Sequence, residues 1–219
     1  MALSFLFPKL KMLPLEETSD GGLVYFGGAF KTWDHSWDEK HYTSRQIFDH
    51  TSKWTNSRQS MATPPYHWHI YQTETFEVVR GTMHYLLDGK ESTLSPGKTV
   101  NIPPGVPHTF WCEEKDGEDL EVLITVRGGP NPGFDGHFVR NFYGFLHSNA
   151  LQGQTPNMLH AMAYMYDSDV IIQDFPLQTG RAANIALGLV AGKLLGGYST
   201  KHEVYEKTIP ADAFTRTSS

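Results

Sequence analysis

Short stretches of apolar, aromatic and β-branched residues dominate the first half of the chain. They cover residues 23–26, 41–48, 75–79 and 120–126, and turn-forming residues separate them. Aromatic and β-branched side chains favour extended backbone, and stretches of this length are typical of strands. The pattern therefore predicts a β-rich half that reaches to about Arg127.

A tight turn is expected at Asp88-Gly89. It separates the strand-like segments 83–87 and 91–94, and an Asp-Gly pair between two such segments indicates a hairpin. Many short strands with frequent turns predict a mainly β fold, a closed jelly-roll barrel of two sheets. A small barrel of this kind can hold one ion and one small ligand.

After Pro132 the apolar residues follow a helical period instead. Asp135 is placed to cap a helix that extends to Leu146, because a short acceptor side chain can bind the free amides of a first turn. Thr155-Pro156 predicts the start of a second helix over Met158–Tyr166, with proline at the first helical position.

The last regular pattern lies within residues 182–198. Apolar residues recur there at helical spacing with Lys193 opposite, and Gly188, Gly192 and Gly196 follow one another at intervals of four. The segment is too short and too polar for the run of about 20 apolar residues that a membrane span requires. We expect a helix packed on the barrel or on a partner subunit. Its apolar residues are Leu187, Val190, Ala191, Leu194, Leu195 and Tyr198.

Four side chains stand out for their chemistry: His67, His69, Glu74 and His108. Alternate residues of a strand point to one face, so His67 and His69 share a face. The residues between His69 and Glu74 allow a turn or bulge that returns the carboxylate to that side. Three imidazoles and one carboxylate form a nitrogen and oxygen ligand set suited to a divalent transition metal.

The two segments that carry these residues resemble the cupin superfamily. Residues 67–81 fit its first motif, H-x-H-x(3,4)-E-x6-G, at every defined position, and residues 97–108 fit its second, G-x5-P-x-G-x2-H. Met61 stands where the first motif begins with glycine, and Cys112 where the second ends with asparagine. Neither position is a metal ligand in the family. The resemblance implies a single cupin barrel with an intact metal site.

Composition limits the classes of function. The chain has 219 residues and a formal net charge of -6, which leaves no basic footprint for nucleic acid. Cys112 is its single cysteine, and the first residues lack the charged leader of a signal peptide. We therefore expect a cytoplasmic protein. We assign residues 1–130 to the cupin barrel with its N-terminal strands and residues 131–219 to a helical C-terminal extension.

A substrate pocket is expected beside the metal. Phe110 and Cys112 share the parity of His108 and should face the barrel interior. Other strands supply the remaining candidates, and the sequence indicates no catalytic group beyond the metal site. The candidate pocket residues are Phe110, Cys112, Tyr85, His84 and Arg127.

The function follows from the open positions that such a site leaves on its metal, where substrate or dioxygen can bind. The C-terminal segment resembles, more loosely, single-cupin proteins of filamentous fungi in natural-product pathways. This resemblance implies an enzyme that oxidises an aromatic or polyketide-derived small molecule, with Fe(II) favoured and Mn, Ni, Zn or Cu as the other candidates. Because cupins often pair through sheet edges or swapped segments, the resemblance to that superfamily implies a homodimer. Two alternatives stay open. One is a redox-neutral metalloenzyme (isomerase, dehydratase, decarboxylase or cyclase), and the other a binding protein without turnover.

Overall fold

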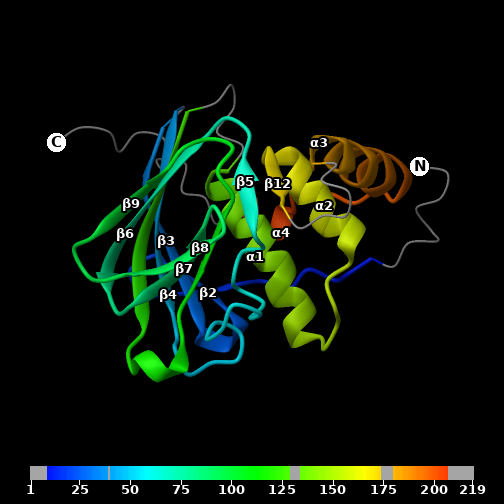
Figure 1. The fold of residues 1–219 in the computed structure, drawn as a ribbon. Helices are drawn as coiled ribbons and strands as arrows, with labels where there is room; N and C mark the ends of the chain where they lie inside the picture. The colour runs from blue at the N-terminus through cyan, green and yellow to red at the C-terminus, as the bar shows by residue number, and fades with distance from the viewer. Residues whose placement is uncertain (1–8, 39, 129–133, 174–179, 207–219) are drawn as a thin grey trace.

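The computed structural model describes residues 9–38, 40–128, 134–173 and 180–206. Two antiparallel sheets form a barrel-like body, and helices lie beside it (Figure 1). The larger sheet has seven strands in the order β1-β2-β3-β4-β11-β6-β9. Its strands are β1 (Glu16–Glu17), β2 (Leu23–Tyr25), β3 (Phe30–Trp37), β4 (His41–Phe48), β11 (Leu120–Arg127), β6 (Thr73–Arg80) and β9 (Thr99–Ile102).

The smaller sheet has five strands in the order β12-β5-β10-β7-β8. Its edge strand β12 comes from the C-terminal part of the chain and pairs antiparallel with β5, Val170 opposite His69. Two 3-10 turns, η2 (Phe26–Gly28) and η3 (Glu114–Asp116), lie between strands. The strands are β12 (Val170–Ile172), β5 (His67–His69), β10 (His108–Trp111), β7 (Met83–Leu87) and β8 (Lys90–Leu94).

Aromatic side chains from both sheets meet in the core. Phe48 and Phe76 of the seven-stranded sheet lie 5.5 Å and 4.9 Å, ring centre to ring centre, from Phe110 of the five-stranded sheet. Such offset and edge-on contacts are the favoured geometries of aromatic pairs. The inner face of β6 alternates with its outer face as the sequence predicts, since Glu74, Phe76 and Val78 are buried while Glu77 is exposed.

One glycine in the first motif is required by both conformation and space. Gly81 has a φ of 76°, which L side chains rarely adopt. A Cβ atom at this position would also lie 2.4 Å from the Asp119 carbonyl oxygen. With any residue other than glycine at position 81, the end of β6 could not approach the strand that follows Asp119 so closely.

The helices follow the barrel in sequence and cover one side of it (Figure 1). Asp135 caps α1 as predicted, because its carboxylate accepts a hydrogen bond from the Phe138 amide at 2.9 Å. The second helix begins at Met158, where Asn157 rather than Thr155 provides the cap. The helices are α1 (Gly136–Leu151), α2 (Met158–Asp167), α3 (Gly180–Ala183), the π-helix η5 (Asn184–Leu195) and α4 (Glu203–Glu206).

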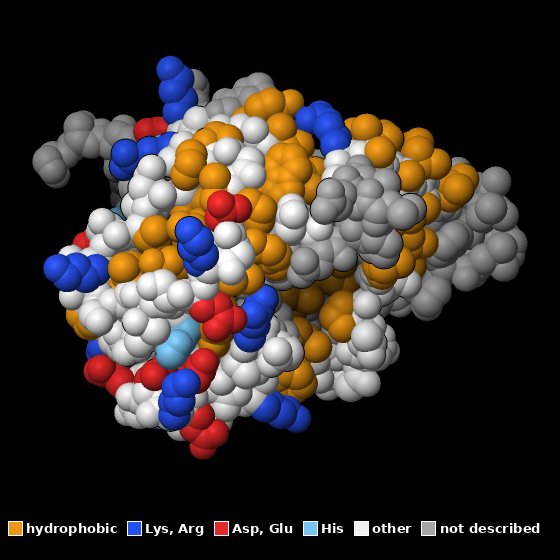
Figure 2. All heavy atoms as spheres, in the orientation of Figure 1, with side chains coloured by type: hydrophobic (Ala, Val, Ile, Leu, Met, Phe, Trp, Pro, Cys, Tyr) orange, Lys and Arg blue, Asp and Glu red, His pale blue; other side chains and the backbone are white. Residues whose placement is uncertain are grey.

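The face of η5 that packs inward differs from the expected one. Gly188 and Gly192 are buried against α2, where Cβ atoms would lie 2.3 Å from Met162 O and 2.6 Å from Leu159 O. Val190, Leu194 and Leu195, expected on the packed face, are instead 42%, 57% and 44% exposed. Hydrophobic side chains accordingly gather on the surface of the helical half (Figure 2).

The helix packs on α2 because glycine allows the two backbones to meet. Its Asn184 also donates a 2.6 Å hydrogen bond to the Val170 carbonyl oxygen of β12. Among the described residues, no helix combines the length and hydropathy needed to cross a membrane. The domain division at residue 130 and the homodimer stay predictions.

Candidate metal centre

The structure brings His67, His69, Glu74 and His108 together. One ligand atom from each lies within 4.8 Å of the others, and all four side chains are buried. The three histidines belong to the five-stranded sheet, where His108 of β10 pairs with His67 of β5. Glu74 comes from β6 of the opposite sheet. The cluster therefore forms where the two inner faces meet.

Backbone carbonyl groups orient two of the imidazoles. His67 Nδ1 lies 2.7 Å from Pro65 O, and His108 Nδ1 lies 2.9 Å from Val106 O. A carbonyl oxygen only accepts, so Nδ1 is the donor in both contacts and Nε2 of each ring is left for a ligand. Second-sphere hydrogen bonds of this kind fix the tautomer of metal-binding histidines.

Glu74 provides the negative charge of the cluster. Its Oε2 lies 2.6 Å from His108 Nε2 and 3.3 Å from His69 Nε2. Burial opposes ionisation of this carboxyl group, but the contacts with His108 and His69 outweigh burial and hold its pKa below the usual value. Glu74 is therefore an anion that can bind a cation at neutral pH.

His69 gives the clearest test of whether these residues fit a metal. Both of its ring nitrogens are buried and have no hydrogen-bond partner among the described residues. Burial, followed by the neighbouring His108 and His69, also lowers the pKa of His67 well below its usual value. Neutral imidazoles are the form that ligates metals. A buried imidazole without a hydrogen-bond partner among the described residues, beside a carboxylate and two oriented imidazoles, fits a divalent cation.

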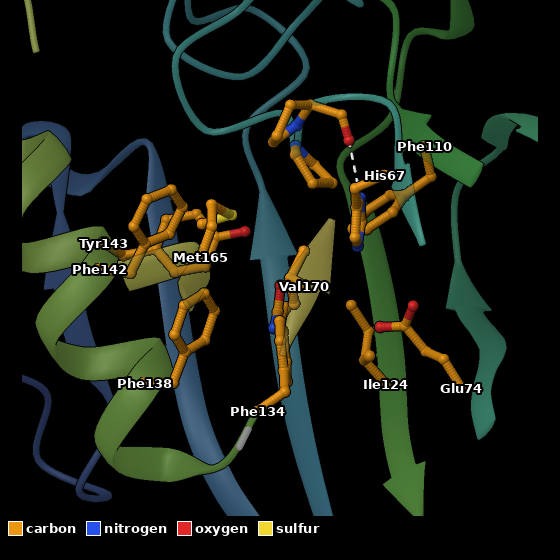
Figure 3. Close-up of a pocket in the computed structure, with 13 residues that line it drawn as sticks. His67, Glu74, Phe110, Ile124, Phe134, Phe138, Phe142, Tyr143, Met165 and Val170 are labelled. Carbon is orange, nitrogen blue, oxygen red and sulfur yellow. Dashed lines mark hydrogen bonds between the residues drawn. The ribbon is translucent and has the colours of Figure 1, made fainter. Parts of the chain in front are cut away.

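An apolar cavity opens at the cluster (Figure 3). Its volume is about 30 Å³. Phe138, Phe142 and Met165 from the helices lie across the cavity from His67 and Glu74 (Figure 3). Its lining residues are Gln46, Pro64, Pro65, His67, Glu74, Phe110, Ile124, Phe134, Phe138, Phe142, Tyr143, Met165 and Val170.

A wider groove of about 450 Å³ lies outside this cavity, between residues 58–66 and α1. Pro64, Pro65, Phe142 and Tyr143 line both spaces. The groove therefore reaches the wall of the metal cavity at these four side chains. Burial, together with the charge of Glu74, raises the pKa of Tyr143, so its hydroxyl group stays protonated at neutral pH.

Of the five pocket residues expected from the sequence, Phe110 lines the cavity. Cys112 is buried, its thiol donates to Thr55 O at 3.3 Å, and burial raises its pKa to about 12. His84 contacts the Asp116 carboxylate at 2.9 Å and stacks on Trp111. Cys112, His84, Tyr85 and Arg127 are not among the described lining residues of this cavity.

Sequence reasoning missed the helical contribution to the cavity. Phe138, Phe142 and Met165 lie on α1 and α2, and Phe134 stands beside His69 with 5.6 Å between ring centres. Spacing of four between Phe138 and Phe142 indicates one helix face, which predicts burial. It gives no information on which sheet that face covers.

The fold and the cluster define a β-barrel protein with a candidate metal centre between its sheets. Residues 59–126 match the family described as "Cupin domain". This segment of the chain thus matches a cupin domain, and the mainly β cupin fold with C-terminal helices predicted from the sequence is confirmed.

Curated relatives include fungal oxidoreductases. The chain is 25% identical to "Probable oxidoreductase virH" of Hypocrea virens over 72% of this chain and 74% of that protein. It is 29% identical to "Oxidoreductase iacF" of Pestalotiopsis fici over 53% and 59%. It is 33% identical to "Quercetin 2,3-dioxygenase" of Bacillus subtilis over 26% and 17%. The matched segments thus span from under a fifth to about three quarters of these relatives.

Proposed function

We propose that the chain is a metal-dependent cupin oxidoreductase of the dioxygenase type, which acts on an aromatic or polyketide-derived small molecule in secondary metabolism. The observation that carries the proposal is the buried His69 imidazole, which has no hydrogen-bond partner among the described residues and lies beside Glu74 and two oriented histidines. The names of the fungal and bacterial relatives support oxidoreductase chemistry.

His67, His69, His108 and Glu74 would hold the metal. When bound, a divalent ion such as Fe(II) supplies a Lewis acid and a redox centre for dioxygen. Pro65 O and Val106 O keep two of the imidazoles in the ligating tautomer. The single carboxylate leaves net positive charge on the ion, which favours an anionic oxygen of the substrate.

The cavity wall supports an aromatic substrate. Phe110, Phe134, Phe138 and Phe142 line it together with aliphatic side chains. Aromatic rings pack well in offset or edge-on contact with other rings. The same wall excludes water from the reacting atoms, which strengthens electrostatic interactions in the site.

Metal content tests the proposed ligands. The full-length protein and its His67→Ala, His69→Ala and His108→Ala variants are purified in parallel and analysed by inductively coupled plasma mass spectrometry. We expect about one divalent ion per wild-type chain and a large loss in each variant. The exposed His35, replaced by Ala in the same way, is the matched control and should retain the ion. Full occupancy in the His67→Ala and His108→Ala variants would contradict the assignment.

Dioxygen dependence tests the reaction class. Quercetin and a panel of aromatic and polyketide-like compounds are incubated with the protein in air, under strict anaerobiosis and under ¹⁸O₂. The proposal predicts conversion only with dioxygen, and products that carry two labelled oxygen atoms. Equal conversion without dioxygen would replace it with the redox-neutral metalloenzyme.

A further inference from the structure

Among the described lining residues of the cavity, Gln46 and Tyr143 carry polar groups that the metal site does not use. Gln46 lies on β4, is 1% exposed and lines the cavity together with His67 and Glu74. Its side-chain amide nitrogen donates to Ser44 Oγ at 3.2 Å. Its Oε1 atom is buried and has no hydrogen-bond partner among the described residues. The amide therefore presents an unused acceptor.

An unused buried acceptor is unfavourable for folding alone. Its desolvation is not compensated, whereas an apolar side chain at the same position would avoid that cost. Apart from Gln46, His67, Glu74 and Tyr143, the described lining residues of the cavity are apolar and include Phe110, Ile124 and Val170. In ligand pockets, a few polar groups within an apolar lining fix the orientation of the ligand.

The strand register places Gln46 away from the metal ligands. Glu74 and Tyr42 are both paired with Val126 of β11. Gln46 lies four residues along β4 from Tyr42, which corresponds to roughly 13 Å at about 3.3 Å per residue. Ile124 belongs to the level of inward-facing cross-strand pairs between these two and also lines the cavity. The cavity thus extends over three such levels of the sheet, with Glu74 at the first and Gln46 at the third.

We propose that Gln46 determines substrate specificity by accepting a hydrogen bond from a hydroxyl group of the substrate, at the end remote from the metal. The inference rests on the proposed function, because the other end of the substrate is held at the His67, His69, Glu74 and His108 cluster. The substrate class is an elongated aromatic compound with an anionic oxygen at one end, a hydroxyl group at the other and an apolar body.

Such a compound is larger than the free space of the inner cavity. The outer groove shares Pro64, Pro65, Phe142 and Tyr143 with it, so displacement of the Phe142 and Tyr143 side chains would join the two spaces. Ligand binding commonly changes side-chain rotamers while the backbone moves little. The hydroxyl contact at Gln46 then selects among compounds that fit the joined space.

A matched pair of ligands tests the proposal. Zinc-loaded protein, which has no redox activity, is titrated with 6-hydroxy-2-naphthoate and with 6-methoxy-2-naphthoate by isothermal calorimetry. Each ligand offers a carboxylate to the metal, but only the first can donate to Gln46. We expect wild-type protein to bind the hydroxyl compound about tenfold more tightly, which is about 1.4 kcal/mol.

The Gln46→Met variant should lose this preference while binding the same amount of zinc. Gln46→Leu provides a second apolar replacement in case the first unfolds, and Gln154→Met, on the exposed Gln154 side chain, is the matched control that should keep the preference. Equal binding of the two ligands by wild type would show that Oε1 accepts no hydrogen bond from the ligand hydroxyl group, and would overturn the proposal. A preference that persists in both Gln46 variants would overturn it as well.

Zinc uptake and naphthoate binding together distinguish failure of the proposed metal site from failure of the proposed contact at Gln46. Wild-type protein that takes up no zinc refutes the metal site itself, whatever the naphthoates do. Zinc uptake at the four ligands without binding of either naphthoate leaves the metal site intact and refutes the substrate class inferred here.

Discussion

Replacement of His69 by leucine should have opposite effects on stability in metal-free and metal-loaded protein. In the metal-free protein, the substitution removes a ring whose two nitrogens are buried without hydrogen-bond partners among the described residues. Leucine can pack on Phe134, which now lies edge-on to the imidazole at 5.6 Å. A structural histidine would give the reverse result, because its loss would remove hydrogen bonds.

The expected gain in stability of the metal-free variant follows from one buried atom that has no hydrogen-bond partner among the described residues. His69 Nε2 lies 3.3 Å from Glu74 Oε2 and retains some electrostatic attraction, so we count only Nδ1. An unsatisfied buried polar atom costs about 1–3 kcal/mol, and allowing for the lost attraction to Glu74 we expect a gain of about 1 kcal/mol. For a chain of this size that raises Tm by about 2–4 °C.

With metal bound, the wild-type protein should be more stable than the His69→Leu variant. An ion at about 100 times its Kd stabilises the wild-type fold by about 2.7 kcal/mol, which corresponds to about 5–11 °C in Tm. His69→Leu lacks one ligand and should gain little at the same concentration. Differential scanning calorimetry in EDTA and in excess Zn²⁺ measures both effects. A variant less stable than wild type in EDTA that still gains the full shift with zinc would refute the reasoning.

Two further predictions concern the helical half. His160 is buried, and burial lowers its pKa to about 4. In the unfolded chain this imidazole is protonated below about pH 6.5. The contribution of His160 to the free energy of unfolding is therefore complete above pH 6.5 and falls by about 3 kcal/mol as the pH is lowered from 6.5 to 4. Urea denaturation of wild type and His160→Phe at pH 7.5 and 4.5 should show a smaller acid loss in the variant, and equal losses would contradict this. Gly188→Ala should destabilise the protein by about 1 kcal/mol, because an overpacking cost of about 2 kcal/mol against Met162 O exceeds the roughly 1 kcal/mol gained in helix propensity. Ala186→Gly on the exposed face of the same helix measures the propensity effect alone, and a Gly188→Ala variant as stable as wild type would refute the close packing.

The clustering of the metal ligands could be predicted because it depends on local geometry. His67 and His69 are alternate residues of one strand, so parity places both on one face. Glu74 follows after a short turn and lies on the inner face of the opposite sheet. The place of His108 in the cluster could be predicted only from the family motif, because its pairing with His67 joins residues far apart in the sequence. Strand parity could not show that Cys112 lies outside the cavity while Phe110 lines it.

The helical wall and the packing of η5 could not be predicted in the same way. A helical period identifies an apolar face but not the surface that it meets, so Phe138 and Phe142 gave no sign that they line the metal cavity. In η5 the apolar period does not identify the face that meets α2. Close contact of Gly188 and Gly192 with the α2 backbone decides which face is buried, and Leu194 is left exposed.

Anomalous X-ray diffraction from crystals of the full-length protein, recorded above and below the absorption edges of Mn, Fe, Ni, Cu and Zn, tests the central claim most directly. The account predicts a single strong anomalous peak between the sheets, about 2.0–2.2 Å from a ring nitrogen of each histidine at positions 67, 69 and 108 and from a Glu74 oxygen. Crystals of metal-loaded protein that show no peak there, or a peak bound by other side chains, would contradict it.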